Sequence, residues 1–158
     1  MTARAHSPAR RLIHLLAYGF GAGYAPRAPG TFGTLVAVPL YLALREVDLT
    51  YYLATVAALF ALGVWICGVT ERDLGTDDAP GIVWDEIVGF LITMAAAPAG
   101  WWWIVAGFVL FRLFDIAKPF PIRLLDQRVP GGLGVMLDDA LAGVYALVLL
   151  QAAAWALR

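Results

Sequence analysis

The segment YYLATVAALFALGVWICGVT, residues 51–70, is an almost uninterrupted apolar run in a chain of 158 residues. At a rise of about 1.5 Å per residue, a helix of this length reaches roughly 30 Å, the thickness of the hydrocarbon core of a bilayer. The segment therefore predicts a membrane-spanning helix. The composition agrees, because 61% of the residues are hydrophobic and only 15% are charged, which is unusual for a water-soluble domain.

Further apolar segments flank this helix, and prolines, glycines and charged residues separate them. Helices are expected over residues 12–24, 34–44, 82–97, 101–116 and 135–157. We predict an all-α fold, a compact bundle of about five or six helices that is partly embedded in a membrane and forms one domain over residues 1–158. The helices at 34–44 and 82–97 are short for a full crossing, so they are expected to cross, tilt or re-enter.

Three segments between these helices are expected to form loops, at residues 25–33, 71–81 and 123–134. The first contains prolines and glycines that disfavour a regular helix, and Thr31 or Thr34 could cap the helix that follows it. The other two are rich in charged residues.

Charge and cysteine content exclude some classes of function. A formal net charge of -1 and a pI near 6.0 argue against a nucleic-acid partner. The single Cys67 excludes an internal disulfide and a zinc site with several cysteines. Arg4, Arg10 and Arg11 precede a short apolar stretch as in a signal peptide, but that stretch contains His14 and ends in glycines, so we expect it to be retained.

The order of the predicted helices places most acidic residues on one side of the membrane. With the basic N-terminus in the cytoplasm, alternate crossings return the loops near residues 71–81 and 115–137 to the cytoplasmic side. Ten of the twelve acidic residues are then expected to gather there. They are Glu71, Asp73, Asp77, Asp78, Asp85, Glu86, Asp115, Asp126, Asp138 and Asp139.

Two segments, WDEIVG at 84–89 and LDDALAG at 137–143, each place two adjacent acids at the polar start of an apolar helix. In both, a glycine follows an acid by four residues on the same helix face, which would let the two helices approach closely. The four carboxylates would then repel one another unless they were protonated or bridged by a cation, and hard oxygen ligands suit magnesium or manganese. The alternative is that these acids only favour the positive end of the helix dipole. The acids are Asp85, Glu86, Asp138 and Asp139.

A third segment, residues 111–122, places Arg112, Asp115 and Lys118 at three-residue steps along one helical edge. They could form an intrahelical ladder of ion pairs. Alternatively, the two cations hold phosphate oxygens while Asp115 binds metal, orients water or attacks phosphorus. The loop at residues 29–33 could add backbone amides to an anion site, or it could be a simple turn.

The sequence lacks the residues that several other phosphatase mechanisms require. Cys67 lies within an apolar run without a cysteine-phosphatase loop, and His6 and His14 lie near the N-terminus. A phosphate-binding loop that ends in Gly-Lys-Ser or Gly-Lys-Thr is also missing. Metal-assisted hydrolysis by carboxylates is the chemistry that remains.

Five blocks of the sequence together resemble the phosphatidylglycerophosphatase A family of bacterial membrane lipid phosphatases. They occur in the family order over residues 12–150, and the last three are long and specific. The blocks are GFGAG at 19–23, APGTFG at 28–33, IVWDEIVG at 82–89, FRLFDIAKPFPI at 111–122 and GGLGVMLDDALAG at 131–143.

The resemblance implies magnesium-dependent hydrolysis of phosphatidylglycerophosphate to phosphatidylglycerol and inorganic phosphate, at the cytoplasmic side of the inner membrane. Our hypothesis is that the two acid pairs hold Mg²⁺, that Arg112 and Lys118 bind phosphate, and that Asp115 acts as a base or, failing that, as the nucleophile. The site residues implied by the motifs are Asp85, Glu86, Asp115, Lys118, Asp138 and Asp139, with Thr31, Asp78 and Arg112 as additions.

Two other classes of function remain open at this stage. A soluble all-helical hydrolase of nucleotides would share the metal-binding acids, and a membrane ion carrier would use them to line a pathway. A phosphatidyltransferase is disfavoured because its extended multi-aspartate signature is missing. The expected partners are a phospholipid substrate and the membrane, and an oligomer is compatible with the sequence without following from it.

Overall fold

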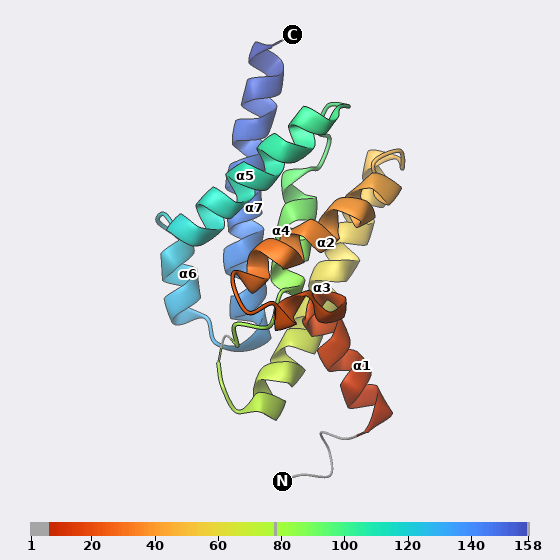
Figure 1. The fold of residues 1–158 in the computed structure, drawn as a ribbon. Helices are drawn as coiled ribbons and strands as arrows, with labels where there is room; N and C mark the ends of the chain where they lie inside the picture. The colour runs from red at the N-terminus through yellow and green to blue at the C-terminus, as the bar shows by residue number, and fades with distance from the viewer. Residues whose placement is uncertain (1–6, 78, 158) are drawn as a thin grey trace.

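The computed structural model describes residues 7–77 and 79–157, and these residues form seven α-helices and one 3-10 helix without a strand (Figure 1). The all-α prediction is confirmed. About five or six helices were predicted, and the additional ones are the short η2 and α6. The elements are α1 (Pro8–Ala17), η2 (Gly19–Tyr24), α2 (Pro29–Leu44), α3 (Leu49–Leu74), α4 (Trp84–Thr93), α5 (Trp101–Ala117), α6 (Ile122–Arg128) and α7 (Gly131–Ala156).

Helix α4 forms the centre of the bundle. It packs against α7, α2, α3 and α5, and its Val88, Phe90 and Leu91 are completely buried. The helix has 10 residues and is therefore about 15 Å long, half the thickness of a hydrocarbon core. The predicted helix at 82–97 is thus shorter than expected, and α4 is a buried helix that positions side chains within the protein.

The predicted close approach of two helices at Gly89 and Gly143 is confirmed. A Cβ atom on Gly143 would lie 2.5 Å from the carbonyl oxygen of Gly89, and one on Gly89 would lie 2.9 Å from that of Asp139. The Thr93 hydroxyl donates to the carbonyl oxygens of Gly89 at 3.0 Å and Gly143 at 3.4 Å. Helices α4 and α7 therefore meet backbone to backbone, one turn from the acid pairs.

Replacing Gly143 by alanine is expected to destabilise the protein by about 2 kcal/mol, because overpacking forces the two backbones apart. Thermal unfolding in detergent checks this expectation. Gly68→Ala is the matched control, since a Cβ on Gly68 of α3 has no neighbour closer than 3.4 Å. An unchanged melting temperature for Gly143→Ala would contradict the tight crossing.

Three predicted loops prove to be partly helical. Helix α2 begins at Pro29. Proline is tolerated at the first helical position because the N–H group that it lacks has no hydrogen-bond partner within the helix there. Helix α3 continues to Leu74, and α6 occupies residues within 123–134. Helix α7 begins at Gly131, where Gly132 lies so close to α3 that a Cβ would be 2.2 Å from the carbonyl oxygen of Val64.

The earlier start of α7 changes the interpretation of its acid pair. Asp138 and Asp139 follow Gly131 by seven and eight residues, about two turns into the helix rather than at its start. The helix dipole acts mainly on the first turn, so it does not account for these two buried acids. The prediction that they begin the helix is therefore wrong, and the alternative based on the dipole applies at most to Asp85 and Glu86.

Two of the described helices, α3 and α7, are long and apolar enough to cross a membrane. Each has 26 residues, a length of about 39 Å. Large apolar side chains are also exposed on the outside of the bundle, among them Trp102 (67%), Val109 (58%) and Val148 (60%). These features fit a membrane protein.

The helix ends that carry acids gather toward one end of the bundle. The lower half of Figure 1 contains the end of α3, the starts of α4 and α7, and α6. The turn between α2 and α3, which carries Glu46 and Asp48, lies at the upper right instead. This arrangement agrees with the predicted convergence of acids. Asp78 lies outside the described residues.

Candidate active site

A cavity of about 200 Å³ lies among α2, α4, α5 and α7 at the end of the bundle that carries the acids. Helix α4 supplies its first turn, α5 its last two turns, and α7 its second and third turns, so segments far apart in the sequence share one space. The cavity is lined by Pro29, Gly30, Ala79, Pro80, Ile82, Asp85, Glu86, Arg112, Asp115, Ile116, Lys118, Asp138 and Asp139.

Three carboxylates meet inside this cavity. One oxygen from each of Asp85, Glu86 and Asp139 lies within 4.8 Å of the others. Burial raises the pKa of Asp85 well above its usual range, and the nearby Glu86 and Asp139 raise it further. Burial also raises the pKa of Glu86 to about 7, although a hydrogen bond with Asp85 and the charge of Arg112 oppose the rise. The cluster therefore needs protons or a cation to relieve its repulsion.

The oxygen atoms in the cavity fit a hard divalent cation. Asp85 Oδ1, Glu86 Oε2, Asp138 Oδ1 and Asp139 Oδ2 are buried, and none has a hydrogen-bond partner among the described residues. Buried carboxylate oxygens are normally hydrogen-bonded or bound to metal. Several unpartnered carboxylate oxygens around one space are the type of ligand that Mg²⁺ or Mn²⁺ prefers.

Asp138 has a different immediate partner from the other three acids. Its Oδ2 accepts a hydrogen bond of 2.6 Å from Lys118 Nζ, which also donates to Asp126 Oδ1 at 2.6 Å. The hydrogen bonds to the two carboxylates outweigh the effect of burial and raise the pKa of Lys118. Lys118 thus remains a cation at the edge of the cavity, held between two acids.

The ladder of ion pairs that was considered as the alternative for Arg112, Asp115 and Lys118 forms only in its first step. Arg112 forms an ion pair with Asp115, and its Nη1 also lies 3.6 Å from Glu86 Oε1. Lys118 does not lie on the same helical edge as Arg112 and Asp115, because it ends α5 in a left-handed conformation with φ of 41°. The two cations therefore have different partners in the cavity, Glu86 and Asp115 for Arg112 and Asp138 for Lys118.

Gly30 lies in the loop at residues 29–33 that was considered as part of an anion site, but its own role was not predicted. A Cβ on Gly30 would lie 2.0 Å from Glu86 Oε1 and 2.8 Å from Arg112 Nη1, so only glycine leaves room for this ion pair. Thr31 lies in the same first turn of α2 but does not line the cavity, and its amide donates to the Ala28 carbonyl. The signal available in the sequence was a glycine directly after a proline at a helix start.

A neighbouring cavity of about 310 Å³ shares one residue with the first. Asp138 lines both spaces, and the second is otherwise formed by the end of α3, by α6 and by the start of α7. Its charged lining residues are Glu71, Asp77, Asp126, Arg128 and Asp138. A ligand larger than a phosphate group could extend from one space toward the other past Asp138.

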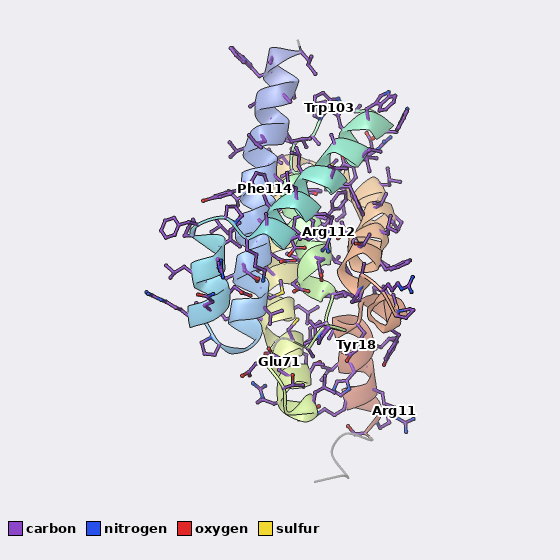
Figure 2. The ribbon with its side chains drawn as sticks, turned by 60° about the vertical axis from the view of Figure 1, so that its left-hand side comes forward. Arg11, Tyr18, Glu71, Trp103, Arg112 and Phe114 are labelled. Carbon is purple, nitrogen blue, oxygen red and sulfur yellow. The ribbon has the colours of Figure 1, made fainter. Side chains whose placement is uncertain are left out.

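The fold and the site define a class of protein. It is an all-helical protein with two helices that could span a membrane and a cavity lined by both carboxylates and cations. Figure 2 shows Arg112 on α5, and Glu71 near the end of α3. Such a combination of charges suits a phosphate group bound together with a cation.

The model of one protein family matches residues 15–154 of this chain, and the family is described as Phosphatidylglycerophosphatase A. A phosphatidylglycerophosphatase A of Haemophilus influenzae is 46% identical over 142 residues, which cover 89% of this chain and 87% of the relative. The protein of that name from Escherichia coli is 46% identical over 132 residues, or 83% of this chain and 77% of the relative.

A third relative carries a different name. A Bacteroides thetaiotaomicron protein, provisionally named a phosphatidylinositol-3-phosphatase, is 42% identical over 149 residues, which cover 89% of this chain and 92% of the relative. No solved structure matches this chain. The chain belongs to the phosphatidylglycerophosphatase A family, and it is a phosphatase that hydrolyses a phosphate monoester of a lipid.

Proposed function

We propose that this protein hydrolyses phosphatidylglycerophosphate to phosphatidylglycerol and inorganic phosphate with the help of Mg²⁺. The observation that carries the magnesium requirement is the buried cluster of Asp85, Glu86 and Asp139, whose oxygens lie within 4.8 Å of one another. The substrate is the one named for two relatives that each match this chain at 46% identity. An inositol phospholipid is the second candidate, because the third relative carries that name.

The residues that would hold Mg²⁺ are Asp85, Glu86 and Asp139, with Asp138 beside them. When bound, the ion neutralises negative charge on the phosphate group. Arg112 then contributes hydrogen bonds to phosphate oxygens from the side of α5, and Lys118 does so from the side of Asp138. The ion pairs that both cations now make with carboxylates hold them at the edges of the cavity before a phosphate enters.

Asp115 is the residue that we assign to proton transfer. It lines the cavity, and its ion pair with Arg112 holds its carboxylate beside the space that a phosphate would fill. A carboxylate in that place can accept the proton of an attacking water. Asp115 acting as the nucleophile is the less favoured assignment.

We propose that the cavity faces the cytoplasm at the bacterial inner membrane. Arg10 on α1 donates to both oxygens of Asp73 on α3 at 2.9 Å, so the basic start of the chain lies at the same end as the acids. Positively charged segments near membrane-spanning helices prefer the cytoplasmic side. This contact supports the orientation that the sequence predicts.

Removing divalent cations is expected to abolish phosphate release by the purified protein. Phosphatidylglycerophosphate in detergent micelles is the substrate, and the activity should return when Mg²⁺ is added after a chelator. Activity that persists in the chelator would contradict the metal requirement, while the protein could still be a phosphatase. A protein that releases phosphate from another lipid phosphate monoester but not from phosphatidylglycerophosphate would contradict the proposed substrate.

A further inference from the structure

An apolar groove lies on the outside of the bundle between α5 and α7. It has a volume of about 330 Å³ and is lined by Phe114, Val144, Tyr145, Val148 and Leu149. The rings of Phe114 and Tyr145 pack edge to face with centroids 5.6 Å apart. The Tyr145 hydroxyl donates to the Phe120 carbonyl at 3.2 Å, so the polar end of this side chain is already satisfied.

The groove begins close to the candidate active site, although the two spaces share no lining residue. Phe114 precedes Lys118 by one helical turn on α5, and Tyr145 and Leu149 follow Asp138 by seven and eleven residues, which places them on the same face of α7. Lys118 and Asp138 are joined by a hydrogen bond of 2.6 Å. The ion pair therefore lies one helical turn from Phe114 on α5 and two turns from Tyr145 on α7, so the groove starts about 10 Å or less from the edge of the cavity.

The distance from the cavity to the far end of the groove matches one leaflet of a bilayer. Leu149 lies eleven residues beyond Asp138, which is about 16 Å along α7. Half of a hydrocarbon core of roughly 30 Å is about 15 Å. Figure 2 places Phe114 on the side of α5 toward α7, whereas Arg112 contacts Glu86 of α4. A lipid whose phosphate lies in the cavity could thus extend a chain along the groove toward the middle of the membrane.

We propose that this groove binds one acyl chain of the substrate lipid itself while the phosphate monoester of that lipid lies in the carboxylate cavity. The proposal rests on the proposed function, because it takes a phospholipid as the substrate. Lys118 lines the cavity one helical turn from Phe114 of the groove and offers a positive charge to the phosphate-bearing headgroup. The groove would orient the substrate relative to the site and distinguish acylated from deacylated phosphates.

The test compares two substrates that carry the same phosphate monoester. One is long-chain phosphatidylglycerophosphate in mixed micelles, and the other is its deacylated, water-soluble headgroup. Val148→Trp fills the groove, and Val109→Trp is the matched control, because Val109 lies outside the groove on α5 and is about as exposed as Val148 (58% and 60%).

We expect Val148→Trp to lower the ratio of kcat/KM for the lipid to that for the headgroup on the order of fivefold. The effect is moderate because the bilayer or micelle already offers an acyl chain apolar surroundings. The same ratio should stay unchanged in Val109→Trp. The proposal would be overturned if the lipid-to-headgroup ratio of kcat/KM were the same in both variants. It would also be overturned if Val148→Trp lost activity on the lipid and on the headgroup equally. A wild-type protein that hydrolyses neither substrate would contradict the proposed function itself.

A second measurement uses the wild-type protein and does not depend on the folding of a variant. A substrate analogue with a photoactivatable group in one acyl chain should label residues 144–149, and excess unlabelled substrate should suppress the label while phosphatidylcholine should not. Labelling spread over all exposed helices, or suppressed equally by both lipids, would show that bulk lipid covers the groove and would overturn the proposal.

Discussion

Asp139→Asn is expected to lower the rate of phosphate release by about a thousandfold or more, since the cluster would lose one of its anionic ligands. Asp139 is only 3% exposed, and its Oδ2 has no hydrogen-bond partner among the described residues. The asparagine has nearly the same shape and can still occupy the space. Phosphate release from the lipid in mixed micelles measures the effect, and Asp85→Asn should behave in the same way.

The same variant is expected to retain or gain thermal stability in the presence of a chelator. Three buried carboxylates close together repel one another when no cation is bound. Removing one of their negative charges should therefore increase the free energy of unfolding. Asp126→Asn is the matched control, because Asp126 contacts Lys118 but lies outside the cluster. Asp139→Asn with full activity would refute the assignment, whereas loss of both activity and folding would indicate a structural role.

Gly30→Ala is expected to lower kcat/KM by about a hundredfold, because a displacement of about 1 Å in a catalytic group can cost that much. The added methyl group would lie 2.0 Å from Glu86 Oε1, so the Glu86 side chain or the start of α2 must move. Steady-state hydrolysis of the lipid phosphate measures the loss. The reduction should be seen even with saturating Mg²⁺ if Glu86 has lost its position relative to Arg112.

Stability gives the independent readout for this variant. Alanine is favoured over glycine within a helix by roughly 1 kcal/mol, and Gly30 has no left-handed conformation that alanine would strain. The melting temperature should therefore change little. Gly68→Ala again serves as the control, and it should keep full activity because its Cβ meets only ordinary contacts. Full activity in Gly30→Ala would contradict the tight approach of α2 to Glu86.

The acids of the site could be predicted because each stands out against an apolar background. Asp85 and Asp139 interrupt runs of apolar residues, and a glycine four residues after each indicated where two helices approach. The structure brings these acids into one cavity and confirms the close approach of the helices. Their assignment as metal ligands remains a prediction, as do the roles of Arg112, Asp115 and Lys118.

The start of α7 could not be predicted from local preference. Gly131, Gly132 and Gly134 disfavour a helix in isolation, but the backbone of α3 packs against this turn and leaves no room for a Cβ at Gly132. Tertiary packing thus outweighs local preference there. The partners of Lys118 could not be predicted from the sequence either. Asp126 and Asp138 are 8 and 20 residues away from it and reach it only because the chain turns back after α5.

The meeting of Gly89 and Gly143 determines how the carboxylate spacing responds to sequence change. One turn below the acids, the two helices touch through main-chain atoms, whose dimensions are the same in every protein. Substitutions of neighbouring apolar side chains alter volume without altering this contact. The distance between the backbones that carry Asp85 and Asp139 is therefore set mainly by main-chain contact rather than by the size of neighbouring side chains.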